Sequence, residues 1–274
     1  MCRIILTLHP MLYLMKKIRI LIILVLLLHV CACAQQTTIN RIEVIGNSIS
    51  DIIPVSAEVE AYVYHSAIDL RGIDVQKKKQ NFINLMLPSI LIAKFEIEHT
   101  RQLVVALVSK REALSNSEEI YLKNLKKTYK CKAISELLSR LKTHPTSIVL
   151  AQAAIESGWG TSRFYREANN IFGVWSYSKN EPRIMTSEDR DGEAVFVRKY
   201  DSLPESFDSY FKTLARGPYS EFRNTREKTN DVYELIPHLK VYSELGEEYV
   251  SRLEGLIKYN KLEQYDDYIL NMNK

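Results

Sequence analysis

The chain is short of the residues that mark unusual classes of protein. Its 274 residues include only nine glycines, eight prolines and four cysteines. So little glycine and proline excludes a collagen-like repeat, and a hydrophobic content of 46% excludes a disordered chain. The length and the hydrophobic content together suffice for a buried core in one or two domains.

No excess of positive charge remains once the N-terminal segment is set aside. Four of the 37 basic residues lie within the first 34 residues, which hold no acidic residue: Arg3, Lys16, Lys17 and Arg19. The other 33 basic residues are balanced by 33 acidic ones. Zero net charge gives no electrostatic reason to expect a nucleic-acid partner.

The first 34 residues have the layout of an export signal. Basic residues precede an apolar run at 20–30, which is shorter than the roughly 20 residues that a membrane span needs. Small residues follow the run, and Ala32-Cys33-Ala34 fits cleavage before Gln35. An alternative is a lipoprotein signal with Cys33 as the lipidated residue. We therefore expect residues 1–34 to be a signal peptide and the protein to be exported to the periplasm or cell envelope, soluble or lipid-anchored.

Removal of this signal leaves Cys131 as the only cysteine, so the mature chain forms no internal disulfide. No Cys/His cluster has the spacing of a zinc site, and we predict no metal site. Cys131 is followed by apolar residues at Ile134 and Leu137, which favours a buried thiol over a nucleophile.

The mature chain divides into three predicted parts. Residues 35–73 form a tether and an irregular lead-in, with weak strand patterns at 42–44 and 59–64. Residues 74–130 form a helical hairpin, because apolar residues recur every three or four positions and Ser115 with Glu118 makes a capping box. Residues 131–274 form a mainly helical domain with one β-hairpin. The predicted class is α+β.

Turn and cap signals place the elements of that last domain. The spacing predicts helices at 131–141 and 146–157. The Asp191-Gly192 pair predicts the turn of a β-hairpin between strands at 183–188 and 194–200. Strict alternation in the first strand puts Glu188 and Asp189 on opposite faces. Ser202 and Glu205 make a second capping box, which opens a helix through residue 214.

The helix at 146–157 carries the most unusual side chain of the chain. It is apolar on almost every face, yet it contains Glu156 near its C-terminal end. A carboxylate in apolar surroundings loses solvation, which raises its pKa and suits it to act as a general acid. The alternative is a structural glutamate that accepts hydrogen bonds from the following turn.

Two motifs resemble those of a known family. Ala151-Gln152-Ala153-Ala154-Ile155-Glu156-Ser157-Gly158-Trp159-Gly160 and Asn170-Ile171-Phe172-Gly173-Val174 are similar to the signature of bacterial glucosaminidases, glycoside hydrolase family 73, and of its Bax-like branch in particular. The resemblance implies a lysozyme-like domain, cleavage of peptidoglycan, no obligatory cofactor, and Glu156 as the catalytic acid. Glu-Ser-Gly motifs also occur in lytic transglycosylases, which leaves that reaction open.

Glycoside cleavage usually needs a second polar group across the sugar. The acidic residues of the hairpin are the candidates: Glu181, Glu188, Asp189, Asp191 and Glu193. The family's pattern before the turn glycine favours Glu188. Tyr242, in Tyr242-Ser243-Glu244 with Tyr249 nearby, resembles the family's tyrosine motif and is a third catalytic candidate. The alternative for each acidic residue is a solvated turn residue without a catalytic role. The alternative for Tyr242 is a half-buried tyrosine without one.

Rings and amides near the motifs are candidates for substrate binding, because the apolar faces of sugars stack on aromatic rings. They are Gln152, Trp159, Asn170, Phe172, Trp175 and Tyr177. For Phe172 a place in the core is favoured over one in the site, and the alternative for Asn170 is a cap of the following turn. Together these features predict an exported endo-β-N-acetylglucosaminidase acting on peptidoglycan glycan strands. The alternatives are a lytic transglycosylase and an inactive envelope-binding scaffold.

Overall fold

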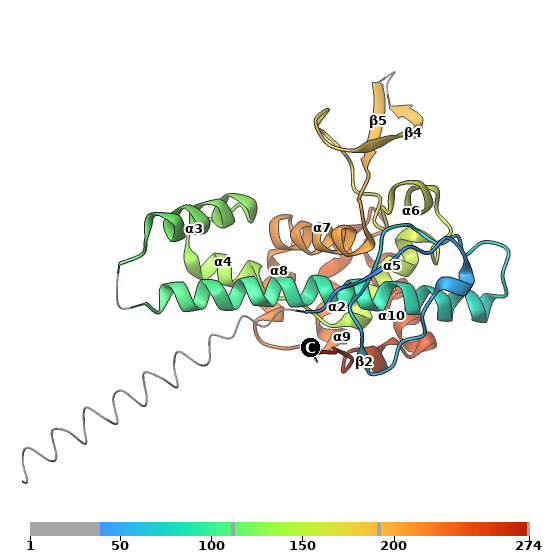
Figure 1. Cartoon of the computed structure of the whole chain (residues 1–274), viewed down its shortest axis with the longest axis horizontal. Coiled ribbons are helices and arrows are strands. Elements are labelled where there is room, and N and C mark those ends of the chain that lie inside the picture. Colours follow the sequence, from blue (N-terminus) through green and yellow to red (C-terminus); the bar gives the residue numbers. More distant parts are fainter. Residues whose placement is uncertain (1–38, 111–112, 191–192, 273–274) are drawn as a thin grey trace, which may run out of the picture. The chain divides into compact units, whose positions relative to one another are not determined.

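The computed structural model describes residues 39–110, 113–190 and 193–272, and gives only the backbone at 187–190 and 193. The described residues from Asn40 onward belong to one compact unit. Most of them are helical, and the longest strands are β4 (Arg183–Arg190) and β5 (Glu193–Arg198), which form a hairpin that projects from the helices (Figure 1). The predicted mainly helical α+β class with one hairpin lobe is confirmed.

Helix α2 (Val75–Val108) runs through the middle of this unit (Figure 1). Asp74 begins it by accepting hydrogen bonds from the backbone N–H groups of Gln76 and Lys77. Residues 82–93 are all buried, and they pack against α5 (Thr146–Ser157) and α7 (Leu203–Arg216). The division at residue 131 stays a prediction, because α2 shares its core with helices beyond that boundary.

Helix α3 (Asn116–Thr128) contributes little to the core, since Leu122 is its one buried residue. The capping box at its start is confirmed: Ser115 Oγ accepts from the Glu118 N–H, and the Glu118 carboxylate accepts from the Ser115 N–H. Helix α4 (Ile134–Arg140) follows and packs against both α2 and α3.

The described part of the lead-in, from residue 39 onward, packs into the core, and it has strands at both predicted strand patterns, 42–44 and 59–64. Strand β1 (Ile42–Val44) pairs in parallel with β3 (Tyr62–Tyr64), and β2 (Glu58–Val59) pairs in parallel with β6 (Ile269–Leu270) near the C-terminus. The side chains of Tyr64, Ile68 and Leu70 are fully buried. Burial of large apolar side chains holds this segment against the helices.

The hairpin and the helix after it depart from two local predictions. Met185 pairs with Phe196 and Asp189 with Ala194, so three residues of β4 lie opposite one residue of β5. This bulge interrupts the regular ladder, and because the side chains of Glu188 and Asp189 lie outside the described residues, their alternation stays a prediction. Ser202 precedes α7 but its side chain makes no capping bond, and the Glu205 carboxylate accepts from the Asp201 N–H rather than from the Ser202 N–H, so neither half of the predicted capping box forms.

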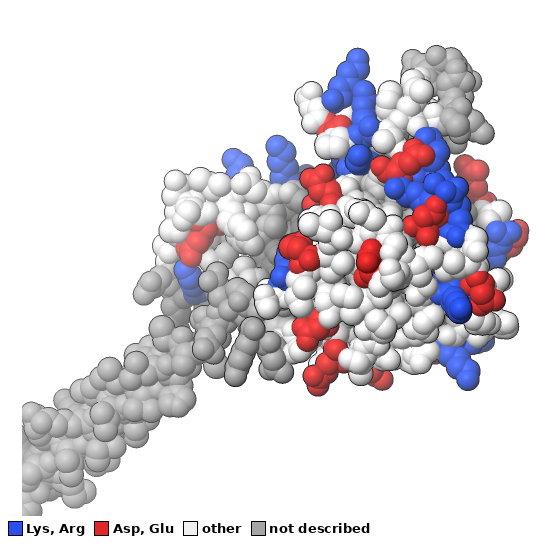
Figure 2. Space-filling view, turned by 45° about the vertical axis from the view of Figure 1, so that its right-hand side comes forward, with Lys and Arg blue, Asp and Glu red and all other residues white. Residues whose placement is uncertain are grey.

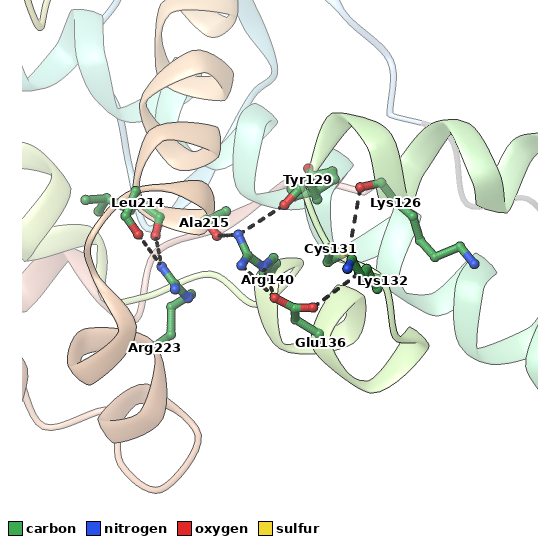
Figure 3. Close-up of polar contacts among 10 residues, drawn as sticks. Lys126, Tyr129, Cys131, Lys132, Glu136, Arg140, Leu214, Ala215 and Arg223 are labelled. Carbon is green, nitrogen blue, oxygen red and sulfur yellow. Dashed lines mark hydrogen bonds and ion pairs between the residues drawn. The ribbon is translucent and has the colours of Figure 1, made fainter.

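Arg140 ties three helices together (Figure 3). Its Nη1 donates to the carbonyls of Tyr129 and Ala215, at 3.1 and 2.7 Å, and its Nη2 pairs with Glu136 at 2.6 Å. Cys131 lies beside this group and is half-buried rather than buried. Desolvation raises the pKa of its thiol, which disfavours the nucleophilic thiolate.

Four further α-helices complete the described part of the unit. They are α6 (Arg163–Ala168), α8 (Ser220–Arg226), α9 (Val232–Leu235) and α10 (Glu247–Asn260), with 3-10 turns η1 (Ile49–Asp51), η2 (Ile236–Tyr242) and η3 (Leu262–Tyr265). Helix α10 packs against α5. Within the described ranges, no helix combines the length and hydropathy that crossing a bilayer requires.

Candidate active site

Helix α5 is anchored at its start and ends in an unusual turn. The Asp266 carboxylate accepts from the backbone N–H and the hydroxyl of Ser147, at 2.7 and 2.8 Å. All residues from Thr146 to Ala154 are buried. At the other end the chain stays left-handed for three residues, 158–160, with φ of 57°, 57° and 76°. Glycine adopts such angles without strain, which explains the glycines on both sides of Trp159.

Gly160 has a second reason to lack a side chain. An added Cβ would lie 3.0 Å from Leu70 Cδ1 and 3.3 Å from Phe82 Cδ2. We expect Gly160→Ala to reduce the free energy of unfolding by about 2 kcal/mol or more, from left-handed backbone strain and overpacking together. Gly173→Ala is the control, because Gly173 also has positive φ, 61°, but no atom within 4 Å of the added Cβ. Urea unfolding that gave equal losses in the two variants would contradict a packing role.

Glu156 lies in the last turn of α5 with its side chain half-buried. Its Oε1 accepts a hydrogen bond from the Tyr249 hydroxyl at 2.9 Å. Burial raises the pKa of the Glu156 carboxyl, and the bond from Tyr249 partly opposes this. Within the described part of the chain, no cation pairs with Glu156. The carboxyl is therefore suited to hold a proton at a higher pH than an exposed glutamate.

Three tyrosines from the C-terminal elements gather around this carboxyl. The ring of Tyr242 stacks on that of Tyr249, with centroids 5.6 Å apart and planes at 15°, and lies 6.1 Å from that of Tyr219. Burial, and next the negative charge of Glu156, raise the pKa of all three phenols. The phenols therefore stay protonated and serve as hydrogen-bond donors. Tyr242, a predicted catalytic residue, is half-buried within this cluster.

Gln152 is not available to a substrate, contrary to the prediction. Its side chain is fully buried, its Nε2 donates to the Tyr249 hydroxyl at 3.0 Å, and its Oε1 accepts from the Tyr210 hydroxyl at 2.6 Å. Both ends of the amide are thus used inside the protein. A buried amide needs such partners, because burial without them is costly.

Asn170 and Phe172 are also structural rather than substrate-binding. Asn170 is fully buried; its amide donates to the carbonyls of Val174 and Arg198, and its Oδ1 accepts from the Val174 N–H. These bonds tie the loop after α6 to β5. Phe172 is buried and its ring stacks on Tyr210 at 4.4 Å. The motif signal marked both residues, but their side chains face the core.

The remaining predicted rings are accessible. Trp159 is half-buried, with its ring edge-on to Phe82 at 5.3 Å and the Lys79 ammonium 5.2 Å from its centroid. Trp175 and Tyr177 are 39% and 86% exposed, and their ring centroids lie 6.3 Å apart. The backbone of Trp175 bridges to Val197 of β5, so this aromatic pair accompanies the hairpin.

The described side chains do not identify the second catalytic group on the hairpin. The backbone of Glu188 lies in the bulged part of β4, while its side chain and those of Asp189, Asp191 and Glu193 lie outside the described residues. Glu181 is described: it pairs with Arg198 at 2.8 Å and accepts from Ser176, and these contacts lower the pKa of its carboxyl.

Sequence reasoning did not find the residues behind Glu156. Sequence patterns place Tyr249 only near Tyr242, and they give no sign that Tyr210 and His144 belong to the site. The spacing of Tyr249, Leu253 and Ile257 on α10 does indicate a buried face. No local pattern indicates that this face meets Glu156.

Comparison with known proteins assigns the family. Residues 131–262 match the glucosaminidase family, described as mannosyl-glycoprotein endo-beta-N-acetylglucosaminidase. Protein bax of Escherichia coli K12 is 28% identical over 201 residues, which cover 67% of this chain and 70% of bax. Exo-glucosaminidase LytG of Bacillus subtilis is 24% identical over 210 residues, 70% of this chain and 68% of LytG.

Among solved structures, the catalytic domain of the autolysin Auto from Listeria monocytogenes is 24% identical, with a TM-score of 0.39 over 62% of this chain and 97% of that domain. The family match and the two relatives confirm the resemblance that the motifs predict. Residues 131–262 match the glucosaminidase family, and this domain makes the chain a glycoside hydrolase.

Proposed function

We propose that this protein is an exported peptidoglycan hydrolase, an endo-β-N-acetylglucosaminidase in which Glu156 is the general acid. The observation that carries the proposal is the state of Glu156: its pKa is raised by burial, no described cation pairs with it, and one of its oxygens is held by Tyr249. The family match supports the reaction class. The names of two relatives support the substrate. One is exo-glucosaminidase LytG, and the other is peptidoglycan hydrolase FlgJ of Salmonella typhimurium, which is 37% identical over 95 residues, 31% of this chain and 30% of FlgJ.

In the proposed reaction, protonated Glu156 donates its proton to the glycosidic oxygen as the bond from that oxygen to the anomeric carbon breaks. A water oxygen then forms the new bond to the anomeric carbon. In one route Glu188 takes a proton from this water and so activates it. In the other, the oxygen of the substrate's own N-acetyl group first attacks the anomeric carbon, and the water then displaces that oxygen. Tyr242 is the described hydroxyl group suited to orient the acetamido group or the water.

The exposed rings are suited to hold the sugars. Trp159 lies in the turn after Glu156, and Trp175 and Tyr177 accompany the hairpin, so stacking on either side of the cleaved bond is proposed. On the face drawn in Figure 2, basic and acidic side chains are interspersed. Such a surface is compatible with a largely neutral glycan and does not favour a polyanion.

Digestion of purified sacculi tests the proposal. We expect soluble fragments that carry a new reducing N-acetylglucosamine end, identified by mass spectrometry. A 1,6-anhydro end would establish a lytic transglycosylase, and an absence of fragments would favour the scaffold alternative. Because LytG is named an exo-enzyme, the fragment lengths matter as well. Internal cleavage releases long fragments first, whereas terminal cleavage releases disaccharides from the start.

Export is a separate part of the proposal, and its signal lies outside the described residues. We expect envelope-fraction protein to begin at or near Gln35, or at a lipidated Cys33. N-terminal sequencing decides whether cleavage occurs. Incorporation of a palmitate analogue that disappears in Cys33→Ala would decide for the lipid anchor, and an intact N-terminus would contradict both forms.

A further inference from the structure

A chain of four buried hydrogen bonds ends at Glu156. The Tyr249 hydroxyl lies 2.9 Å from Glu156 Oε1, Gln152 Nε2 lies 3.0 Å from Tyr249, and Tyr210 lies 2.6 Å from Gln152 Oε1. The far end is His144, whose Nε2 lies 2.9 Å from the Tyr210 hydroxyl. The four residues behind Glu156 are between 0 and 3% exposed, so water does not compete for these bonds.

All the bonds in this chain point the same way. The Gln152 amide nitrogen only donates, so Tyr249 accepts from it and directs its own proton to Glu156. The Gln152 oxygen only accepts, so the Tyr210 hydroxyl donates its hydrogen to that oxygen. His144 Nε2 must then carry a hydrogen and donate to Tyr210. One direction of donation therefore runs from His144 to the carboxyl of Glu156.

The reverse direction is the alternative, and it changes the state of Glu156. It requires a bare Nε2 on His144, a Gln152 amide turned over, and a Tyr249 proton directed at Gln152. Tyr249 then has no proton left for Glu156. In that case the Tyr249 oxygen can only accept. The Glu156 carboxyl then makes a hydrogen bond to Tyr249 only when Oε1 carries a proton and donates it.

The surroundings of His144 select between the two directions. Its Nδ1 is buried and has no hydrogen-bond partner among the described residues. The rings of Tyr210, Phe211 and Phe222 lie 5.1–5.8 Å from its own ring. An orphaned N–H group in such a place is rare, and a bare lone pair is better tolerated. The neutral tautomer with hydrogen on Nε2 leaves only a lone pair at Nδ1.

A charged imidazole is also disfavoured here. Burial lowers the pKa of His144 well below its usual range, and the positive charges of Arg226 and Lys94 lower it further. His144 therefore stays neutral while the enzyme works, and its hydrogen remains on one nitrogen. The groups that influence the other end of the chain, at Glu156, are the phenols of the tyrosine cluster, which stay protonated.

We propose that His144, through Tyr210, Gln152 and Tyr249, is a positioning residue that fixes which oxygen of Glu156 carries the acidic proton. Because Oε1 always receives the Tyr249 hydrogen, the proton of the neutral acid resides on Oε2 and is offered to the substrate. The Gln152 amide transfers no proton. Its orientation links the direction of the hydrogen bond at Tyr210 to the direction of the one at Tyr249. The inference rests on the proposed role of Glu156 as the acid and adds the device that orients it.

The test uses NMR on the resting protein, so it does not depend on activity. In 15N spectra of the imidazole groups, His144→Gln identifies the His144 signals by their loss. We expect hydrogen on Nε2 and a bare Nδ1 in the unaltered protein. Hydrogen on Nδ1 would overturn the proposal, and the unchanged signals of the other histidines in His144→Gln establish that the variant used for the assignment is folded.

The second measurement is the titration of the Glu156 carboxyl by 13C NMR. Tyr249→Phe removes the donor to Oε1 and should raise the pKa of Glu156. Tyr210→Phe leaves that donor in place but frees the Gln152 amide to turn, so a smaller rise in the same direction is expected. Tyr165→Phe is the matched control, because Tyr165 is fully buried and its hydroxyl donates to the Ile68 carbonyl, outside the chain.

The outcomes separate this inference from the proposed function. An unchanged Glu156 titration in folded Tyr210→Phe, or an equal shift in Tyr165→Phe, would overturn the positioning chain. A Glu156→Gln enzyme that still hydrolysed glycan would overturn the catalytic role and leave both NMR results standing. If both hold, the upper pH limit of kcat should move to higher pH in Tyr249→Phe, with kcat lowered roughly tenfold or more and KM little changed.

Discussion

Glu156→Gln should abolish the release of soluble fragments from peptidoglycan while the protein stays folded. Glutamine has nearly the shape of glutamic acid and still accepts the hydrogen bond from Tyr249, but it has no acidic proton. Loss of a positioned general acid costs about 10²- to 10⁴-fold in rate. The measurement is turnover on purified sacculi, with circular dichroism and thermal unfolding to establish the fold.

The stability of the same variant provides an internal control. Burial raises the pKa of Glu156 in the folded protein, so the folded state prefers the neutral acid. Stability is lost as pH rises from the unfolded pKa through the raised folded pKa, because the charged form must then be buried. Glu156→Gln removes this loss, and its Tm at neutral pH should equal or exceed that of the unaltered protein. Activity above a tenth of the original with an unchanged Tm would overturn the assignment.

The pH dependence of turnover follows from the same group. The acid works only while protonated, so turnover should fall as pH rises through the Glu156 pKa. Because that pKa is raised, the fall should come at a higher pH than for an exposed glutamate.

Glu188→Gln is expected to have the second largest effect. If Glu188 takes the proton of the attacking water, its loss lowers kcat by about 10²-fold or more and leaves KM almost unchanged, since it acts mainly in the transition state. Asp189→Asn is the matched neighbour and should be mild. Initial rates over a range of substrate concentrations separate kcat from KM in both variants.

The opposite result would also be informative. A weak effect of Glu188→Gln together with a strong effect of Tyr242→Phe would favour attack by the substrate's acetamido group. Equal and mild losses in Glu188→Gln and Asp189→Asn would show that neither is catalytic. Attention would then pass to Glu193, which begins β5 directly after the turn.

The bulge in β4 means that regular strand alternation alone cannot be used to interpret the Glu188 and Asp189 variants. Alternation along a regular strand predicts that Glu188 and Asp189 face opposite sides, but the register shifts between Met185 and Asp189. Bulges are common next to active sites, where they redirect a side chain. No local sequence signal marks this bulge, because it depends on how β4 meets β5.

Short-range signals determined the elements around the site. The apolar run of α5 with Glu156 near its end, the capping box of Ser115 and Glu118, and the pairing of β4 with β5 on either side of the Asp-Gly pair each depend on signals within about a dozen neighbouring residues. Their physics is local: helix period, cap bonds and turn angles. The same reasoning failed at Ser202, because the Glu205 carboxylate found a different backbone N–H one residue away.

Short-range signals did not show which polar side chains of the motifs are buried. Gln152 and Asn170 belong to motifs that resemble a catalytic family, and polar residues in such motifs suggest contact with substrate. Whether an amide faces a sugar or the core depends on the helix packed against it. Here α10 and α7 supply the partners of Gln152, and the loop after α6 encloses Asn170.

The sequence by itself determined the helical class with one hairpin, the family motif and the candidate acid Glu156. Only the tertiary structure decided what holds that acid. Tyr249 is 93 residues away along the chain, and His144 reaches Tyr210 across 66 residues. Such partners are selected by the way α5, α7 and α10 pack, because side-chain period shows which face of a helix is buried but not which helix covers it.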